Sequence, residues 1–443
     1  MRSHFAGVGG TGMSALALYL AGRGQDVSGS DRLFDNGGGA EVRAALEAAG
    51  VKIFPQDGSG IDKNCRLVVS TAIEETVPEV KRARELECPV LHRSEILEEA
   101  CQTGRGIAVS GTSGKSTVTA MIYACLHEAG MDPSVVSGAP LLQLRRDGLW
   151  GNAYGGKGEW VVFEADESDG TLVRYHPEIG LLLNLDRDHK ETSELTEIFR
   201  TFRAQVHGAF VTHAHRDDCR DLGGPDALLF GDAQNIGLRG DHVEFTFEGV
   251  EFYVPFPGHH TVENALAAAI TARAAGVPLA VSAKALSHFA GVHRRHEKAG
   301  AVRGVTVFDD FAHNPAKVEA AVQAFRSAAP SERLVVLFQP HGYGPLRFLL
   351  DDFAAAFRAV MQPQDALLLL PVYDVGGTAD RSISSADLAE RIGEICQIKL
   401  PTREEAPALA ASLAKNGDVV ASMGARDPSL PELAKAIVGA LGH

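Results

Sequence analysis

Residues 106–117 constrain this chain more than any other segment, because they read GIAVSGTSGKST. An apolar run ends in a glycine-rich turn, a lysine and two hydroxyl side chains follow, and residues 118–127 continue with helical periodicity. This order predicts a strand, a phosphate-binding loop and a helix. The pattern is GxxGK[ST], which is shorter than the full Walker sequence. The sequence therefore predicts a polyphosphate site in this part of the chain.

Each residue type in this loop has a chemical reason to be there. Gly111 and Gly114 let backbone N–H groups approach phosphate oxygens. Lys115 supplies positive charge to the terminal phosphates, and Ser116 is a candidate ligand of Mg²⁺. The predicted nucleotide-binding residues of the loop are Gly111, Thr112, Ser113, Gly114, Lys115, Ser116 and Thr117.

A second glycine-rich loop follows the first predicted strand of the chain. Gly7, Gly9 and Gly12 form a GxGxxG pattern, and a helix is predicted directly after them. A second strand over residues 26–30 ends at Asp31, where an acid can bond a ribose hydroxyl. These features predict a Rossmann-like βαβ unit at the start of the chain.

Acidic side chains and a histidine follow two further apolar strands. The strand at residues 160–163 leads into Glu164, and the strand at residues 179–183 precedes His189. Because the carboxyl ends of parallel strands meet at one edge of a sheet, we expect these side chains near the phosphate loop. Glu164 and Ser116 are candidate Mg²⁺ ligands, and His189 is a candidate for a second divalent ion near an acceptor carboxylate.

Residues 213–218 read HAHRDD and resemble part of a metal-binding HxHxDH signature. The final histidine of that signature is absent from the sequence, and no partner cluster follows at a suitable spacing. We therefore interpret this segment as the end of a strand followed by a polar loop.

Length, charge and composition limit the organisation and the partners. A chain of 443 residues predicts about three domains, which we place at residues 1–100, 101–297 and 298–443. Strands and helices alternate, which favours an α/β fold with Rossmann-like first and third domains and a central parallel sheet of P-loop ATPase type. A net charge of −15 argues against binding to nucleic acid or a membrane surface. Six cysteines without CxxC spacing, and no apolar run of transmembrane length, favour a cytoplasmic protein.

Together, these motifs resemble the Mur ligase family over nearly the whole chain. The likeness is greatest to the branch that joins L-alanine to UDP-N-acetylmuramate and to its murein-peptide-recycling relative. The segments that carry the resemblance are residues 5–14, 27–31, 111–117, 164–169, 184–189, 258–264, 291–295, 309–315 and 338–343.

The resemblance implies an ATP-dependent amide ligase of peptidoglycan precursor synthesis. In this family the first glycine loop holds the diphosphate of a UDP-sugar and not NAD. The central domain binds ATP with Mg²⁺, and the C-terminal domain binds the amino acid and closes over the site. The γ-phosphoryl group moves to the carboxylate of UDP-N-acetylmuramate, and L-alanine or another small amino acid attacks the acyl phosphate. The family also implies a monomer or a homodimer.

The resemblance assigns roles to residues by their position in the motifs. The implied substrate contacts are Gly9, Gly10, Thr11, Gly12, Met13, Asp31, Ser70, Thr71, Arg93, His341 and Tyr343. Asn264, Arg294 and Asp309 join the phosphate loop as implied nucleotide contacts, with Asn264 near the adenine. The implied catalytic residues are Lys115, His189, Asp310 and His313.

Several positions depart from the pattern of the family. Ser113 stands where the phosphate loop usually carries a histidine. After Pro340 the family reads HRYxRTR, whereas this chain reads HGYGPLR, so that two arginines become Gly342 and Pro345. Arginine forks commonly clamp carboxylates, so these changes leave open a different amino acid or a different muramyl substrate.

Two other functions are open from the sequence. A nicotinamide oxidoreductase would account for the first glycine loop but leaves the phosphate loop unexplained. A non-catalytic homologue that binds nucleotide would account for the altered residues 342–345. Lys115, Glu164, His189 and Asp310 argue against such a loss of activity.

Overall fold

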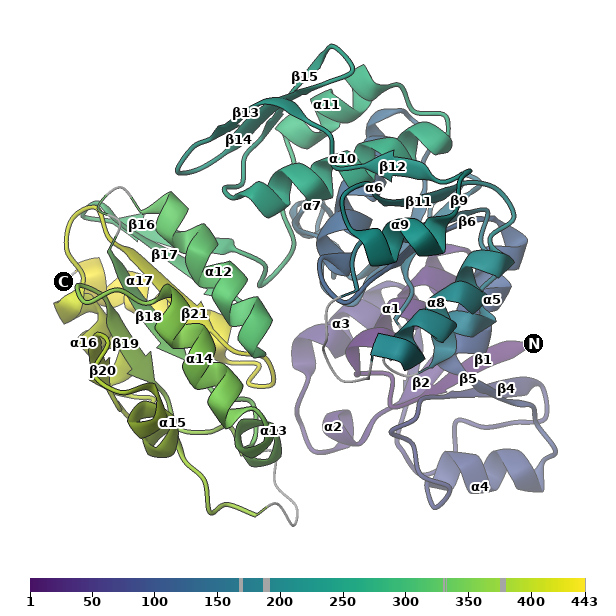
Figure 1. Ribbon diagram of the computed structural model, residues 1–443. Coiled ribbons are helices and arrows are strands. Elements are labelled where there is room, and N and C mark those ends of the chain that lie inside the picture. The colour runs from purple at the N-terminus through teal and green to yellow at the C-terminus, as the bar shows by residue number, and fades with distance from the viewer. Residues whose placement is uncertain (167–169, 186–191, 330, 332, 375–379, 443) are drawn as a thin grey trace. The chain divides into compact units, whose positions relative to one another are not determined.

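The computed structural model describes residues 1–166, 170–185, 192–329, 331, 333–374 and 380–442. The chain forms two compact units. The first contains residues 1–235, 245–254 and 262–292, and the second contains residues 236–244, 255–261 and 293–443. Each unit holds parallel strands covered by helices, which confirms the predicted α/β class (Figure 1).

The first unit begins with a five-stranded parallel sheet. Its strands lie in the order β3 (Lys52–Phe54), β2 (Val27–Ser30), β1 (Arg2–Ala6), β4 (Cys65–Val69) and β5 (Val90–His92). The helices of this part are α1 (Thr11–Gly22), α2 (Arg32–Asp35), α3 (Ala40–Ala48), α4 (Pro78–Glu85) and α5 (Arg93–Thr103). The strand order reverses at β1, which has β2 on one side and β4 on the other. In open α/β sheets such a reversal marks the crevice where ligands bind.

A seven-stranded sheet forms the second layer of the same unit. Its order is β12 (Leu228–Phe230), β11 (Phe210–His213), β10 (Ile179–Leu182), β6 (Arg105–Ser110), β9 (Trp160–Glu164), β7 (Ser134–Val136) and β8 (Ala153–Tyr154). All pairs are parallel except β7 with β8. The helical segments are α6 (Lys115–Glu128), α7 (Leu142–Arg146), a 3₁₀ turn η1 (Thr171–Arg174), α8 (Thr192–Gln205), α9 (Asp217–Gly223), α10 (His259–Ala274) and α11 (Leu279–Ser287).

The sequence also predicts a β-ribbon over residues 242–254 and an alanine-rich helix over residues 265–275, and both differ in extent from the structure. The predicted ribbon over residues 242–254 is β14 (Val243–Phe247) with β15 (Val250–Val254), and β13 (Gln234–Leu238) adds a third strand. The alanine-rich helix begins at His259, whereas the sequence predicted a start at residue 265. The polar run HHTVEN looked like a loop, but packing buries Thr261 and Val262, so these residues join the helix.

One continuous core joins the two layers of the first unit. Helix α1 contacts β2 of the first sheet and β7 and β8 of the second. The amide of Asn152 donates to the Thr11 carbonyl and to Ser14 Oγ, each at 3.0 Å. A Cβ on Gly155 would lie 2.8 Å from the Gly22 carbonyl carbon, so the backbones approach as closely as glycine permits. Domain boundaries near residues 100 and 297 stay a prediction.

The second unit is a six-stranded sheet with helices on both faces. Its order is β16 (Glu297–Val302), β17 (Val305–Asp310), β21 (Val419–Met423), β18 (Leu334–Phe338), β19 (Ala366–Leu369) and β20 (Gln397–Lys399), and β16 alone runs antiparallel. Its helices are α12 (Pro315–Ala328), α13 (Tyr343–Phe348), α14 (Leu350–Val360), α15 (Ser385–Ile392), α16 (Ala406–Leu413) and α17 (Leu430–Gly442).

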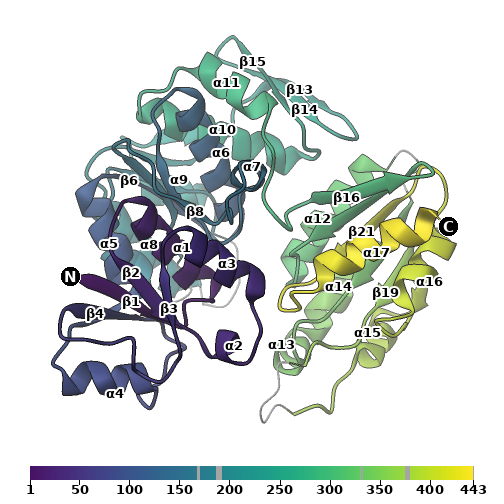
Figure 2. The ribbon, with the colours of Figure 1, turned by 180° about the vertical axis from the view of Figure 1, so that it is seen from behind.

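Two hydrophobic layers hold this unit together, one on each face of the sheet. Helices α12, α14 and α15 cover one face, and α16 and α17 cover the other, as Figures 1 and 2 show from opposite sides. Strand β18 is buried at all five positions because its alternate side chains enter the two layers. Its apolar run is therefore typical of a central parallel strand.

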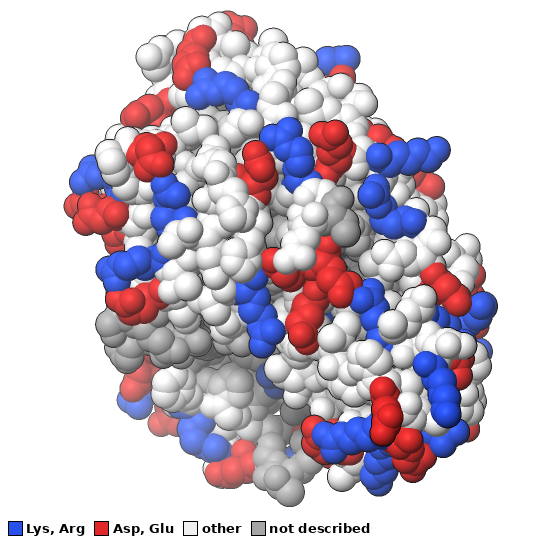
Figure 3. Space-filling view, turned by 90° about the vertical axis from the view of Figure 1, so that its right-hand side faces the viewer, with Lys and Arg blue, Asp and Glu red and all other residues white. Residues whose placement is uncertain are grey.

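No helix in the described ranges is long and apolar enough to cross a membrane. The face in Figure 3 carries acidic and basic side chains interspersed, with no continuous basic surface on it.

Candidate active site

The first glycine loop is pinned to the end of β2 by Asp31. The Gly9 N–H donates to Asp31 Oδ2 at 2.8 Å, and the Leu33 N–H donates to Oδ1 at 2.8 Å, so this carboxylate also caps α2. A Cβ on Gly9 would lie 2.9 Å from Asp31 Oδ2, which explains the glycine. The sequence predicted Asp31 as a ligand contact, and the structure gives it a bond that fixes the shape of the loop.

Cationic and polar groups surround this loop at the carboxyl edge of the sheet. Arg93 follows β5, and its Nη1 lies 2.7 Å from the position of a Cβ on Gly12. Ser70 and Thr71 follow β4, next to the loop that follows β1. Helix α1 has no side-chain cap, so its first N–H groups point toward an anion site. Together, these features suit a diphosphate.

The remaining predicted contacts of this loop differ in exposure. Gly10 and Thr11 are exposed at the start of α1, where their backbone can meet a ligand. Met13 is 4% exposed and its side chain belongs to the core, so the backbone of Met13 is the part left for a ligand. The substrate roles of all these residues stay predictions.

The phosphate loop joins β6 to α6 as the sequence predicted. Gly111 has a φ of +127° and Gly114 a φ of +84°, which favour glycine. A Cβ on Gly111 would also lie 3.0 Å from Leu183 Cβ, at the end of the neighbouring β10. Helix α6 begins at Lys115 without a side-chain cap, so the partial positive charge of its N-terminus lies at the loop. This is the geometry of a polyphosphate cradle.

Asn184 holds this loop from the next strand along the sheet. Its Oδ1 accepts from Thr112 Oγ1 at 2.9 Å and from the Ser113 N–H at 2.8 Å, and its Nδ2 donates to the Ser113 carbonyl at 3.1 Å. Asn184 was not among the predicted site residues. Its position directly after an apolar strand, which was expected beside the loop, is the feature of the sequence that could have indicated this role.

Lys115 lies over the loop that it follows. Its Nζ donates to the Gly111 carbonyl at 2.7 Å and lies 3.7 Å from Asp166 Oδ1, just beyond β9. The lysine side chain is 15% exposed, so its charge is partly shielded from water and acts strongly on a nearby phosphate.

Glu164 is oriented by the loop after β7. Its Oε1 accepts from Ser137 Oγ at 2.7 Å and from the Gly138 N–H at 2.6 Å. Ser137 is a positioning residue that sequence analysis missed, because its role depends on β7 pairing with β9. Oxygen atoms of a carboxylate and of the Ser116 hydroxyl are the ligand types that Mg²⁺ prefers, so the residues present fit that ion.

In the described ranges, no group of three or more His, Cys, Asp or Glu side chains lies close enough together to hold a metal ion. Mg²⁺ in nucleotide sites usually takes one or two protein ligands together with phosphates and water, so this finding is compatible with the predicted ion. His189, the other predicted ligand, lies outside the described residues.

Helix α10 brings its polar start to the phosphate loop. Asn264 Oδ1 lies 3.1 Å from the position of a Cβ on Gly114, so the amide packs against the loop. The histidine of the HxHxDH-like segment, His213, ends β11 and packs against Phe230 with ring centroids 4.9 Å apart. Its Nε2 lies 3.5 Å from Glu263 Oε1. The predicted strand end is confirmed, but the predicted loop is short, because Asp217 and Asp218 begin α9.

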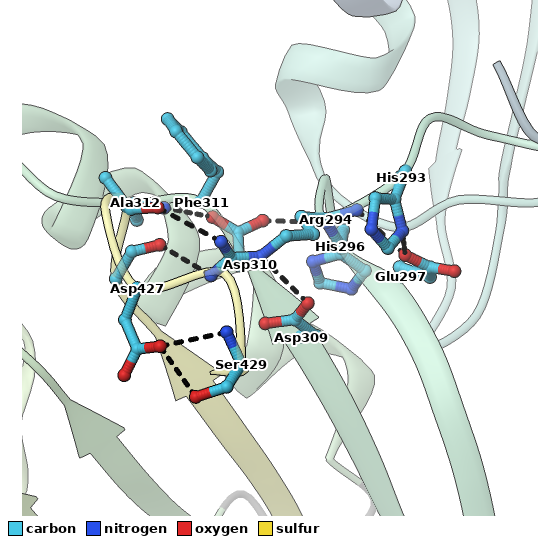
Figure 4. A network of polar contacts seen from close by, with 12 residues as sticks. His293, Arg294, His296, Glu297, Asp309, Asp310, Phe311, Ala312, Asp427 and Ser429 are labelled. Carbon is cyan, nitrogen blue, oxygen red and sulfur yellow. Dashed lines mark hydrogen bonds and ion pairs between the residues drawn. The ribbon is translucent and has the colours of Figure 1, made fainter. Parts of the chain in front are cut away.

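A buried ion pair supports the edge of the second unit. Arg294 donates from Nε to Asp309 Oδ2 at 3.0 Å, and from its two Nη atoms to the carbonyls of Ala425 at 3.2 Å and Gly424 at 2.7 Å (Figure 4). Burial raises the pKa of Asp309 to about 6, although the Arg294 guanidinium lowers it. Both residues were predicted to bind the nucleotide, and that role stays a prediction; the structure shows Arg294 paired with Asp309 and bonded to two carbonyls after β21.

Asp310 and two histidines lie at the carboxyl edge of the second sheet. Asp310 accepts from the His296 N–H at 2.7 Å and from the Ala312 N–H at 2.8 Å, and burial raises its pKa. Burial also lowers the pKa of His313 to about 3, so its ring is neutral near pH 7. The rings of His313 and His341 are 5.0 Å apart, which brings two predicted site residues together.

Tyr343 begins α13 directly after these groups. Its ring packs on the core beside the guanidinium of Arg381, which lies 6.0 Å from the ring centroid. The predicted contacts of the second unit therefore lie at the ends of two strands of one sheet: Asp310 ends β17, His313 follows it, and His341 and Tyr343 follow β18.

Fold and site together define an α/β protein with a loop of phosphate-loop geometry and a separate glycine-rich loop at the start of α1. Residues 2–105 match the description "Mur ligase family, catalytic domain", and residues 294–426 match "Mur ligase, glutamate ligase domain". A curated UDP-N-acetylmuramate–L-alanine ligase from Bdellovibrio bacteriovorus is 34% identical, over 96% of this chain and 96% of that protein. The ligase of the same name from Streptomyces coelicolor is 35% identical, over 96% of this chain and 95% of that protein. The chain belongs to the Mur ligase family.

Solved structures support the same fold. UDP-N-acetylmuramate–alanine ligase from Thermotoga maritima is 25% identical with a TM-score of 0.77, over 99% of this chain and 98% of that one. A murein peptide ligase from Psychrobacter arcticus, 22% identical, has a TM-score of 0.68 over 100% and 99% of the two chains. The second likeness concerns the fold alone.

We expect Asn184→Ala to weaken ATP binding about tenfold, because each lost hydrogen bond contributes on the order of 1 kcal/mol and the loop loses its anchor. Titration calorimetry with a non-hydrolysable ATP analogue measures the effect. Gln102→Ala is the matched control, since that amide lies on α5 and bonds to Glu98 at 3.0 Å. Equal affinities for the two variants would contradict the role of Asn184.

Proposed function

We propose that this protein is an ATP-dependent ligase that joins L-alanine, or another small amino acid, to the carboxylate of UDP-N-acetylmuramate. The observation that carries the proposal is the phosphate loop with Lys115 and Asn184, in a chain that matches named L-alanine ligases over 96% of its length. Three functional regions follow, near residues 1–100 for the sugar nucleotide, 101–297 for ATP and 298–443 for the amino acid.

The residues of the first unit activate the sugar carboxylate. Lys115 and the N–H groups of the loop neutralise charge as the γ-phosphoryl group passes to the carboxylate oxygen. Ser116 and Glu164, together with His189, are the proposed holders of Mg²⁺, which would supply further positive charge to the phosphates. Arg93 and the glycine loop around Gly9 orient the UDP-sugar through its diphosphate.

The second half of the reaction forms the amide. The nitrogen of the amino acid attacks the acyl carbon, the bond from carbon to phosphate oxygen breaks, and phosphate leaves with the electron pair. The amine loses its proton to solvent. His313, whose ring is neutral near pH 7, accepts a hydrogen bond from the amine, and the ring of His341 lies beside it, while Asp310 holds the turn that carries His313.

Release of phosphate from ATP tests this function directly. We expect release that requires both UDP-N-acetylmuramate and an amino acid, and a screen of the twenty amino acids identifies the acceptor. L-Alanine is the expected acceptor. Nucleotide binding without phosphate release would support a non-catalytic homologue, and tight NAD(H) binding by the first glycine loop would support an oxidoreductase.

The same screen, extended from the twenty amino acids to short peptides, tests an alternative acceptor, which Gly342 and Pro345 favour. Both positions replace arginines of the family pattern near His341. An acyl acceptor other than L-alanine, for example a short peptide as in recycling ligases, would then give the highest rate. The proposal also includes a cytoplasmic location, which cell fractionation can check, and a monomeric or homodimeric state, which gel filtration can check.

A further inference from the structure

The loop after β21 lies at the middle of the edge where the amino-acid contacts of the second unit gather. Strand β21 pairs with β17 on one side and with β18 on the other. The end of β17 leads to Asp310 and His313, and the end of β18 leads to His341. A side chain from the loop after β21 can therefore reach both groups.

This loop is held rigidly on both sides of Arg426. Arg294 binds the carbonyls of the two preceding residues at 2.7 and 3.2 Å. On the other side, Asp427 Oδ1 accepts from the Ser429 N–H at 2.9 Å and from Ser429 Oγ at 2.6 Å (Figure 4). The backbone around Arg426 is thus fixed, while its side chain is exposed.

Arg426 points toward the position at which the family pattern has an arginine. A Cβ on Gly342 would lie 3.5 Å from Arg426 Nη1, and Gly342 has a φ of +151°. A longer side chain at position 342 would press against the guanidinium, and an arginine there would add a like charge. In this chain Gly342 leaves the space, and Arg426 supplies a guanidinium in it.

The surroundings of Arg426 suit a carboxylate. Within the described part of the chain, its guanidinium makes no hydrogen bond or ion pair, so its donors are available. The nearby carboxylates are occupied, since Asp427 binds Ser429 and Asp310 binds two backbone N–H groups. A planar guanidinium binds a carboxylate with two parallel hydrogen bonds, which fixes both position and orientation.

We infer that Arg426 binds the carboxylate of the incoming amino acid and takes the place of the arginine that Gly342 replaces. The inference rests on the proposed ligase function. It moves the carboxylate anchor from the loop after β18 to the loop after β21, and it explains how a chain with HGYGPLR retains recognition of an amino acid.

The experiment compares L-alanine with L-alaninamide, which lacks the carboxylate charge. In the wild-type protein we expect kcat/KM for L-alanine to exceed that for L-alaninamide by about a hundredfold. Arg426→Met should lower kcat/KM for L-alanine about 10- to 100-fold and leave L-alaninamide unaffected, so the ratio falls toward one. Added guanidinium ion should restore part of the activity toward L-alanine alone. The KM values for ATP and UDP-N-acetylmuramate should stay unchanged.

Arg358→Met is the matched control, because that arginine lies on α14 and donates to the Arg391 carbonyl at 2.7 Å. Arg426→Lys keeps the charge and should show an intermediate ratio. This inference alone would be overturned if the wild-type protein ligates L-alanine and the Arg426 variants keep the full preference for L-alanine over L-alaninamide. A wild-type protein inactive with every amino acid would overturn the proposed function and the inference with it.

Discussion

Lys115→Ala should lower kcat for ligation about a thousandfold, because charge stabilisation of a moving phosphoryl group by a preorganised cation is commonly worth two to three orders of magnitude. The Nζ of Lys115 lies 2.7 Å from the Gly111 carbonyl, inside the predicted phosphate loop. Its side chain is 15% exposed, so water cannot replace it without reorganising the loop. Phosphate release under saturating substrates measures the loss.

Binding of the sugar nucleotide separates this effect from general damage. The glycine loop that carries Gly9 follows a different strand in a different sheet, so Lys115→Ala should leave the affinity for UDP-N-acetylmuramate near normal. Lys157→Ala changes an exposed lysine of the same unit and serves as the control. If sugar-nucleotide binding collapsed in Lys115→Ala as well, the division between the two anion sites would be wrong.

Arg294→Ala should lower the free energy of unfolding of the second unit by about 3–5 kcal/mol at pH 8, because it leaves a buried carboxylate without its cation. Asp309 is 2% exposed, and its Oδ1 has no hydrogen-bond partner among the described residues. The change also frees the carbonyls of Gly424 and Ala425. Urea unfolding followed by circular dichroism measures the free energy.

The loss should be smaller at pH 5. Burial raises the pKa of Asp309 from 3.8 to about 6, so the folded state holds this proton more tightly than the unfolded chain. The contribution of this group to the free energy of unfolding therefore falls as the pH rises from 3.8 to about 6. Without Arg294 the folded-state pKa rises further, and at pH 5 a neutral acid is left in place of an unpaired charge.

Two further variants check this explanation. Asp309→Asn combined with Arg294→Ala removes the buried charge and should recover part of the stability that Arg294→Ala loses at pH 8. Arg303→Ala, at an exposed position of the same unit, should change the free energy of unfolding by less than about 0.5 kcal/mol. A destabilisation by Arg294→Ala that is equal at pH 5 and pH 8 would show that the lost packing, and not the charge, dominates.

Local sequence signals predicted much of the fold. Gly111, Gly114 and Lys115 predicted the strand, loop and helix correctly. Positive φ values and the start of a helix depend on nearby residues, so a short stretch of sequence indicates them. The first glycine loop and the strand before Glu164 were found in the same way. The start of α10 was missed, because its polar residues become helical through burial of Thr261 and Val262 by distant segments.

Short stretches of sequence were enough to predict the α/β class, the two glycine-rich loops and the resemblance to the family, since each depends on local spacing. Tertiary structure decided which side chains hold those loops: Asn184 and Ser137 act only because β10 lies beside β6 and β7 beside β9. It also paired Gly342 with Arg426, which are far apart in sequence. Such contacts depend on strand order, and strand order is set by how the sheets bury their faces, which no local pattern encodes.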